Sequence, residues 1–426
     1  MDKIERILNF SNQFERVYIY GAGEFGRAVC LLLDEQDFRV GGFIISCHQA
    51  DKKVVLGHAV YSNKVIGSLD KENDGIIVAV NNNYSTIIQN IIINEGFTNI
   101  LVVDEYESIK DIYSKLKYNI EYTQKNDIAI FLYHRVGDIG LDTRRLSLSI
   151  NDFVNQLEYL SSRYNIISSE EDWSNTDGKK AIITFDDGYY DFHDIVLPIL
   201  EEKRIPATVF VTTDYIDSAD ELWGDKLERI VFETLEKHIS FYGQEYFLYN
   251  DAEKSKSLFE LREKLKNTTS SMRISMMSEL ENTTHVKCPP RTSHRLMNSY
   301  EVIRCSKSPY ITIGSHTESH CCLAYEDIDK QRHELLESKI KLESITGAEI
   351  STFAYPYGTS TDFTDDTISI AKEVGYKRIF SACPGMTNCA YCNGRIPRNN
   401  VSTYNTIEDT IAAINRIDRI YGDEYV

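Results

Sequence analysis

The chain has 426 residues, of which 42% are hydrophobic and 26% charged, and its formal net charge at pH 7 is −19. This length exceeds one ordinary hydrophobic core, so two domains are expected in a soluble globular protein. The acidic balance argues against nucleic acid as the main partner, because binding to a phosphate backbone needs a basic surface.

The sequence shows no sign of export or of membrane insertion. The opening residues, MDKIERILNF, mix both charges and lack the apolar stretch of a secretory signal. No run approaches the roughly 18 apolar residues of a transmembrane helix. The nine cysteines are an odd number at irregular spacings, which favours reduced thiols in a cytoplasm. We therefore predict a cytoplasmic protein without a transmembrane segment.

The N-terminal part alternates predicted strands and helices. Residues 16–20 (RVYIY) predict a strand, the turn GAGEFG follows at residues 21–26, and RAVCLLLDE predicts a helix. Further strands are predicted at VGGFIIS, DGIIVAV and NILVVD, with a helix at YSTIIQNIIINEG between the last two. A strand, a glycine-rich turn and a helix open a βαβ unit. Residues 1–110 are therefore predicted to form a Rossmann-like, doubly wound α/β domain, and residues 111–126 a linker.

A second α/β series begins at DIAIFLYHRV, residues 127–136. It continues through a helix (FVNQLEYLSSRY), a strand (AIITF), a helix (DIVLPILEEKRI) and a strand (ATVFVTT). Residues 220–298 are rich in Leu, Glu, Lys, Ser and Met at helical spacing, which predicts a helical insertion. The alternation returns at YITIGSH, residues 310–316, and runs on through STFAYPYG and AKEVGYKRIF. Parallel strands alternating with helices predict a barrel or an open α/β sheet within residues 127–426.

Polar side chains follow several of these predicted strands. Asp186 and Asp187 come directly after AIITF, and His316 and His320 follow YITIGS. The tetrapeptide YPYG follows STFA, and His134 stands after IAIFLY. Because ligands bind at the carboxyl ends of parallel strands, we expect these groups to converge on one rim.

The residue types in these clusters suit metal-assisted hydrolysis. One carboxylate and two imidazoles form a three-ligand set for Zn²⁺ or a similar ion, with a position left for water. The ion lowers the pKa of that water to about 7, and a neighbouring carboxylate suits the proton acceptor that hydrolysis needs. The cation would relieve the repulsion between the adjacent aspartates, and Gly188 would let the backbone turn there. In HTESH the glutamate stands one residue later than in the zinc-protease motif HExxH, so we reject that class.

Four motifs together resemble the polysaccharide deacetylase family, also called the NodB homology or carbohydrate esterase 4 group. They are TFDDG (184–188), SHTESH (315–320), YPYG (355–358) and RIPR (395–398). The phrase LPILEEKRIPATVFV is similar to the same family, and the resemblance covers about residues 127–402. It implies a distorted (β/α)7 barrel and the hydrolysis of an N-acetyl group on an amino sugar, giving a free amine and acetate.

The resemblance also implies a role for each matched residue. Asp186 would be the general base, and Asp187, His316 and His320 would hold the metal. The backbone amide near Tyr357 would help to bind the oxyanion. The ligand set suits Zn²⁺, although Co²⁺, Ni²⁺ or Mn²⁺ would also fit.

Two positions depart from the family pattern. Many members carry an arginine in the third motif that pairs with the base, and Ala354 stands there in this chain. Arg395 or Arg398 would then hold Asp186 ionised, unless both are surface charges. No Leu-x-His lies near the C-terminus, so His134 becomes the candidate general acid, as in members with a permuted barrel; the alternative is a structural histidine.

The glycine turn formed by Gly21, Gly23 and Gly26 follows a strand and opens a helix, which favours a dinucleotide-type phosphate site. The next strand ends at Ile45 and Ser46 without an acid for a ribose diol, so NAD is not expected. The domain resembles the Rossmann-like N-terminal domain of PglD-type sugar acyltransferases, and the stretches that carry this resemblance are YIYGAGEFGR, GFI and IIVAV. This implies a nucleotide or nucleotide-sugar ligand, and the alternative is a scaffold whose glycines serve only tight packing.

Other interpretations stay open beside the predicted metal-dependent carbohydrate N-deacetylase. The same site would also suit another acyl or formyl amide, and the missing secretory signal points to nucleotide-linked or lipid-linked sugars. A non-catalytic sugar-nucleotide-binding protein is a rival of another class. Cys383, Cys389 and Cys392 would form a second metal site with a fourth ligand such as Cys288 or Cys305, or are incidental thiols.

Overall fold

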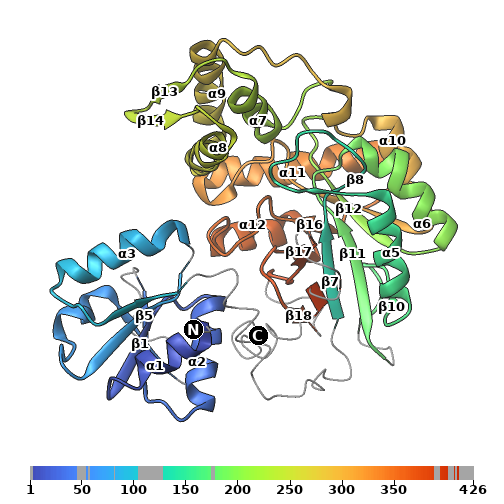
Figure 1. Cartoon of the computed structure of the whole chain (residues 1–426). Helices are drawn as coiled ribbons and strands as arrows, with labels where there is room; N and C mark the ends of the chain where they lie inside the picture. The colour runs from blue at the N-terminus through green and yellow to red at the C-terminus, as the bar shows by residue number, and fades with distance from the viewer. Residues whose placement is uncertain are drawn as a thin grey trace. The chain divides into compact units, whose positions relative to one another are not determined.

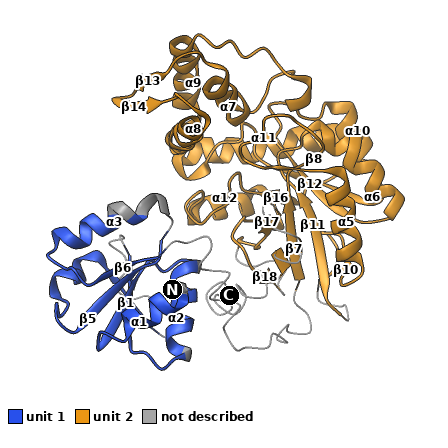
Figure 2. Cartoon of the chain, in the orientation of Figure 1, with its two compact units in different colours: residues 1–121 blue, residues 122–426 orange. Residues whose placement is uncertain are grey.

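The chain divides into two compact units, residues 1–121 and 122–426 (Figure 2). The computed structural model describes residues 3–45, 54–55, 58–80, 82–103, 128–173, 178–387, 394–401, 407 and 410–411. The predicted linker, residues 111–126, lies outside the described residues. Among the described helices, we find none whose length and apolar character would let it span a bilayer.

The first unit is a six-stranded sheet with helices on both faces (Figure 1). Its strand order is β3-β4-β2-β1-β5-β6, and every neighbouring pair is parallel except β3 with β4. The strands are β1 (Arg16–Tyr20), β2 (Val40–Ile45), β3 (Val54–Val55), β4 (His58–Ser62), β5 (Asp74–Val78) and β6 (Ile100–Val102). The helices are α1 (Lys3–Ser11), α2 (Glu24–Glu35), the 3₁₀ turn η1 (Asn63–Ser68) and α3 (Asn82–Asn94).

The two faces of this sheet have separate apolar cores. Helices α1 and α2 pack with Val17 and Ile19 of β1 on one face, whereas α3 packs with Tyr18 and Tyr20 on the other. This alternation follows from the two-residue period of a strand. The sequence did not predict α1, β3 or β4, since β3 is two residues long and β4 (HAVYS) has no apolar run. The Rossmann-like class of this unit stays a prediction.

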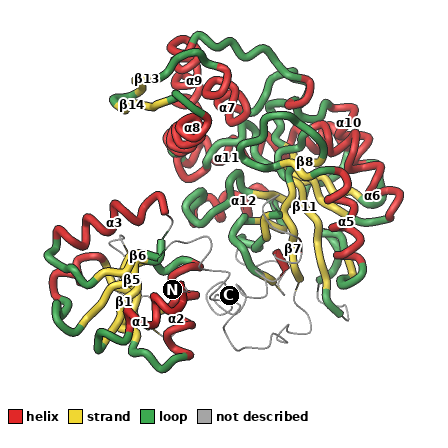
Figure 3. The backbone as a smooth tube through the Cα atoms, viewed as in Figure 1, coloured by secondary structure: helices red, strands yellow, loops and turns green. Residues whose placement is uncertain are grey.

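The second unit is built on a sheet surrounded by helices, in which the strands pair in parallel except β18, which pairs antiparallel with β7 (Figure 3). The strand order is β17-β16-β15-β12-β11-β7-β18, and β10 and β19 pair beside β11 and β7. The strands are β7 (Ile128–Tyr133), β8 (Arg135–Val136), β9 (Ser147–Leu148), β10 (Asn165–Ile166), β11 (Lys180–Phe185), β12 (Ala207–Val211), β15 (Ile311–Ser315), β16 (Thr352–Ala354), β17 (Arg378–Phe380), β18 (Met386–Thr387) and β19 (Asn399–Asn400). The surrounding helices are α5 (Ile150–Ser161), η2 (Phe192–Val196), α6 (Leu197–Lys203), α10 (Ser299–Ser306), α11 (Ile328–Thr346) and α12 (Asp365–Val374), with short turns η3 (Thr292–His294) and η4 (Leu323–Tyr325).

The sheet curls so that its two faces have different partners. One face packs against α5, α6, α10, α11 and α12. The other face gathers Ile130, Ile182, Phe210, Ala354 and Phe380 from five different strands into a second core. The segment 396–401 bridges the two ends, because Ile396 pairs with Phe380 and β19 pairs with β7. The predicted α/β class is confirmed, and the curled parallel sheet agrees with the predicted barrel.

The segment predicted as a helical insertion has its own apolar core. Helices α7 (Trp223–Glu233), α8 (Asp251–Lys266) and α9 (Ser270–Thr284) pack together around it. An unpredicted hairpin of β13 (His238–Phe241) and β14 (Gln244–Phe247) packs one of its faces against this core. Its turn residues, Tyr242 and Gly243, both have positive φ, as a two-residue hairpin turn requires. Tyr-Gly is a weaker signal for this turn than Asn-Gly, which explains the omission.

Candidate functional site

Asp186 and Asp187 follow β11, where the strand pattern ends. Residues 182, 184 and 186 share one face by the period of a strand, so the side chain of Asp186 continues the inner row. Asp187 has φ +72° and Gly188 has φ +81°, which breaks that period. The Gly188 N–H donates to the Asp186 carbonyl at 2.9 Å, closing a tight turn. Both carboxylates therefore reach one site, although adjacent strand residues point to opposite faces.

The two histidines follow β15 in a bend that also uses left-handed backbone. Thr317 has φ +65° and His320 has φ +56°, and the His320 N–H donates to Thr317 Oγ1 at 3.1 Å. His316 Nδ1 donates to the Ala354 carbonyl at 2.8 Å, since a carbonyl oxygen only accepts. That hydrogen bond orients the ring and leaves Nε2 of His316 facing Asp187.

Asp187, His316 and His320 form a compact, buried group. Their potential ligand atoms all lie within 4.8 Å of one another. His320 Nε2 is 3.1 Å and His316 Nε2 is 3.5 Å from Asp187 Oδ1. Burial alone would raise the pKa of Asp187, but the two imidazoles outweigh it and hold this pKa well below its usual range. One oxygen and two nitrogen donors, with an orienting hydrogen bond behind one ring, fit a divalent cation such as Zn²⁺.

Arg398 is the partner of the second carboxylate. Its Nη1 and Nη2 atoms lie 2.6 Å and 2.8 Å from the two oxygens of Asp186. Arg398 is completely buried, and its Nε donates to the Ser381 carbonyl. Burial would raise the pKa of Asp186, but Arg398 more than offsets this and lowers it. Arg395 instead lies at the surface and pairs with Asp365 at 2.6 Å. Arg398 therefore supplies the ion pair with Asp186 that the family pattern expects from an arginine in the third motif.

His134 and Tyr357 border the same site. His134 is half-buried at the end of β7, where burial lowers its pKa against the opposing pull of Asp187 and Asp186. Tyr357 has φ +61°, and its ring lies edge-on to the His320 ring at 4.9 Å between centroids. The structure thus brings Asp186, Asp187, His316, His320 and Arg398 together, with His134 and Tyr357 beside them, but leaves Arg395 at the surface.

No pattern in the sequence indicates the contact between this site and the insertion. Trp223 Nε1, at the start of α7, donates to the Tyr357 hydroxyl at 3.1 Å. That hydroxyl in turn donates to the His320 carbonyl at 3.3 Å. The insertion therefore supports the loop that carries a predicted metal ligand.

The three glycines of the N-terminal turn have different surroundings. A Cβ at Gly26 would lie 1.8 Å from the Gly21 carbonyl oxygen, so the helix and the strand approach closely there. Gly21 has φ +112°, which only glycine adopts readily. Gly23 has no atom within 4 Å of a Cβ, and it caps α2 without a side-chain hydrogen bond. Backbone conformation and tight packing thus explain why glycine is needed at positions 21 and 26. They do not explain Gly23, which has open space around it.

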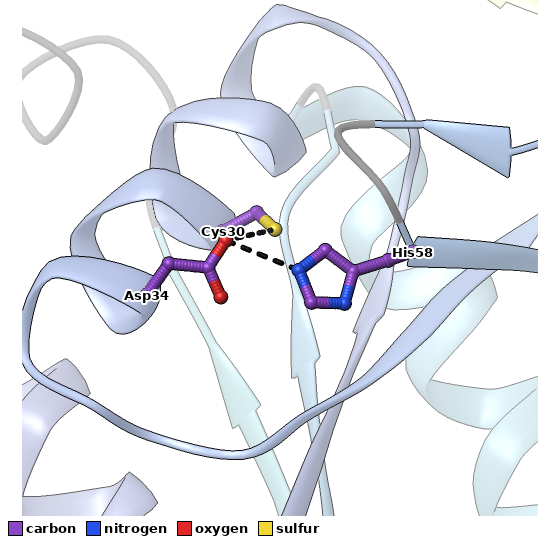
Figure 4. A group of neighbouring side chains, drawn as sticks. All are labelled: Cys30, Asp34 and His58. Atoms are coloured by element: carbon purple, nitrogen blue, oxygen red, sulfur yellow. Dashed lines mark hydrogen bonds and ion pairs between the residues drawn. The ribbon is translucent and has the colours of Figure 1, made fainter.

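Another group of potential ligands lies in the first unit (Figure 4). Cys30 and Asp34 are one turn apart on α2, and His58 begins β4. His58 Nε2 lies 3.1 Å from Asp34 Oδ2, and the Cys30 thiol donates to the same oxygen at 3.6 Å. Burial raises the pKa of Cys30, which favours the neutral thiol. These hydrogen bonds satisfy the group without an ion.

The predicted cysteine site falls mostly outside the described residues, because Cys389 and Cys392 lie there. Cys383 is half-buried and contacts the Gly358 carbonyl at 3.8 Å. Cys288 contacts the Lys226 carbonyl and Cys305 contacts the sulfur of Met297, so each of these thiols has its own neighbour. The second metal site stays a prediction.

Comparison with known proteins finds a family model that matches part of the second unit. A family model described as polysaccharide deacetylase matches residues 174–240 and 278–379. These ranges include both aspartates and both histidines of the site, but neither His134 nor Arg398. No match was found among the curated proteins.

Solved structures of deacetylases are similar to the chain at low identity. A polysaccharide deacetylase from Bacillus cereus is 17% identical, over 68% of this chain and 69% of its own, with a TM-score of 0.44. PplD from Streptococcus pyogenes is 18% identical, over 68% of this chain and 99% of its own, with a TM-score of 0.42. IcaB from Ammonifex degensii is 16% identical, over 69% of this chain and 98% of its own, with a TM-score of 0.44.

Proposed function

We propose that this chain, whose second unit belongs to the polysaccharide deacetylase family, is a metal-dependent hydrolase that removes the N-acetyl group of an amino sugar. The observation that carries the proposal is the buried Asp187–His316–His320 group with the ionised Asp186 beside it. One carboxylate is directed to the imidazoles and the other to a guanidinium. This division suits a cation ligand and a proton acceptor in one site.

Each residue of the proposed site would have a different role in the reaction. A divalent cation held by Asp187, His316 and His320 would polarise the amide carbonyl and the attacking water. Asp186, kept ionised by Arg398, would accept the proton of that water. His134 would give a proton to the departing amine. The backbone N–H near Tyr357 would stabilise the developing oxyanion.

Acetate release tests the proposal directly. We expect the purified protein to release acetate from N-acetylated amino sugars, to lose this activity on chelation, and to regain it with Zn²⁺ or Co²⁺. Mass spectrometry of the products across acetylated, formylated and longer-acyl substrates would separate deacetylation from the alternative acyl hydrolysis. Retention of full activity after complete metal removal would contradict the role of the cation.

We also propose that the first unit binds a nucleotide or nucleotide sugar at the glycine turn. The open space at Gly23, in front of the uncapped start of α2, supports this. Calorimetry with a nucleoside diphosphate should show binding by the wild type and weaker binding by Gly23→Ala. The unfolding temperature of that variant should stay unchanged, because a Cβ there meets no atom. Equal binding by both proteins would favour the scaffold interpretation.

A further inference from the structure

Two arginines of the insertion lie near the cation site without an acidic partner. Arg273 belongs to α9 and Arg262 to α8, and neither guanidinium forms a hydrogen bond or an ion pair with any part of the chain that the structure describes. Arg273 is only 4% exposed, and its Nη1 atom is buried without an acceptor. Leaving a guanidinium N–H buried and unpaired is costly, so this position points to a missing anionic or polar ligand.

Aromatic rings connect Arg273 to the proposed cation ligands. The guanidinium carbon of Arg273 lies 5.2 Å from the centre of the Trp223 ring. Trp223 donates to the Tyr357 hydroxyl at 3.1 Å, and the Tyr357 ring lies 4.9 Å from that of His320. Arg273 therefore lies on the side of the site that the insertion covers, behind the Trp223–Tyr357 pair.

Other cations in this region are already neutralised. Arg144 pairs with Asp225, and Lys266 pairs with Asp362 at 2.6 Å. Arg262 interacts with Tyr357 but has no such partner, and burial and then Arg144 lower its pKa. The unbalanced positive charge of this region thus rests on Arg262 and Arg273, within a chain whose net charge is −19.

We propose that Arg262 and Arg273 bind a phosphate group carried by the acetylated amino sugar, which rests on the proposed function of the neighbouring site. Guanidinium groups recognise phosphate oxygens with paired N–H donors, and a partly buried site strengthens that attraction. A neutral polysaccharide offers no such group. An amino sugar linked through phosphate to a nucleoside or to a lipid does, so the substrate class is a phosphorylated sugar precursor.

Phosphate binding tests the two arginines without turnover. Calorimetry with inorganic phosphate should show binding that weakens about tenfold or more in Arg262→Gln and Arg273→Gln. Lys256→Gln is the matched control, because Lys256 is an exposed cation on the same helix as Arg262. Phosphate that binds at the cation site or in the first unit should bind equally to the wild type and to every variant. It therefore does not contribute to the difference in affinity between them. Equal affinity in the wild type and all variants would overturn the proposal.

Kinetics separate this inference from the proposed function. The two arginine variants should raise KM for a phosphate-linked N-acetyl sugar about tenfold, and should lower kcat/KM for its dephosphorylated counterpart by a much smaller factor. Equal losses on both substrates would overturn the phosphate role. If the wild type released acetate from no substrate, the proposed function would fail, and calorimetry alone would decide the inference. Parallel assays with nucleotide-linked and lipid-linked sugars identify the carrier, and Arg262→Gln alone decides the inference if Arg273→Gln does not fold.

Discussion

Replacing Arg398 with methionine is expected to reduce acetate release by about 100-fold or more and to lower the free energy of unfolding by about 3–5 kcal/mol. Both effects have one cause. Asp186 is 4% exposed and its two oxygens are held by Arg398, so the variant leaves a buried carboxylate without its partner. Such a group takes up a proton, and a protonated Asp186 no longer accepts the proton of water.

Chemical denaturation and acetate release measure the two effects in Arg398→Met. Arg395→Met is the matched control, because Arg395 pairs with Asp365 at the surface and its loss should change stability by less than about 0.5 kcal/mol. The double variant Arg398→Met/Asp186→Leu should recover part of the stability but none of the activity, since it removes the unpaired charge. An active Arg398→Met protein would disprove the pairing role.

Asp187→Asn is expected to reduce both metal content and acetate release, the latter by about 10³-fold or more. Asparagine keeps the shape of aspartate but removes the charge that draws both imidazoles, His316 at 3.5 Å and His320 at 3.1 Å. His316→Ala should behave in the same way. Elemental analysis of the purified proteins gives the metal content, and the acetate assay gives the rate.

Glu318→Gln is the control for the Asp187 and His316 variants. Glu318 lies between the two histidines in the sequence, but its carboxylate pairs with His333 and Lys330, away from the site. It should keep full metal content and activity. A metal-replete, active Asp187→Asn protein would show that the cation binds elsewhere or plays no part in the reaction.

Local patterns predicted the parts of the fold that depend on local sequence. The strands Arg16–Tyr20 and Lys180–Phe185 follow runs of apolar and β-branched residues. The aspartates and histidines were found because each pair lies just after a predicted strand. Their convergence follows from the parallel order of β11, β12 and β15.

The unpredicted features depend on contacts between residues far apart in the chain. Nothing near Ala354 indicates which arginine replaces the one expected there, and both Arg395 and Arg398 were candidates. The choice follows from β19, which pairs with β7 and thereby directs Arg398 inward. The contact of Trp223 with Tyr357 could not be predicted from local sequence either, because it joins the insertion to a loop that is distant in the chain.

The position of Arg398 has a consequence for the order in which this protein matures. Asp186 is synthesised well before the segment 396–401, which bridges the two ends of the sheet and supplies its partner. On the ribosome, the nascent barrel therefore carries an unsatisfied carboxylate until that late segment emerges and docks. Docking of this segment adds β19 to the sheet and pairs Arg398 with the Asp186 carboxylate in the same event. Under the proposed function, Asp186 should become a competent proton acceptor only after residues 396–401 have been synthesised and have paired with the sheet.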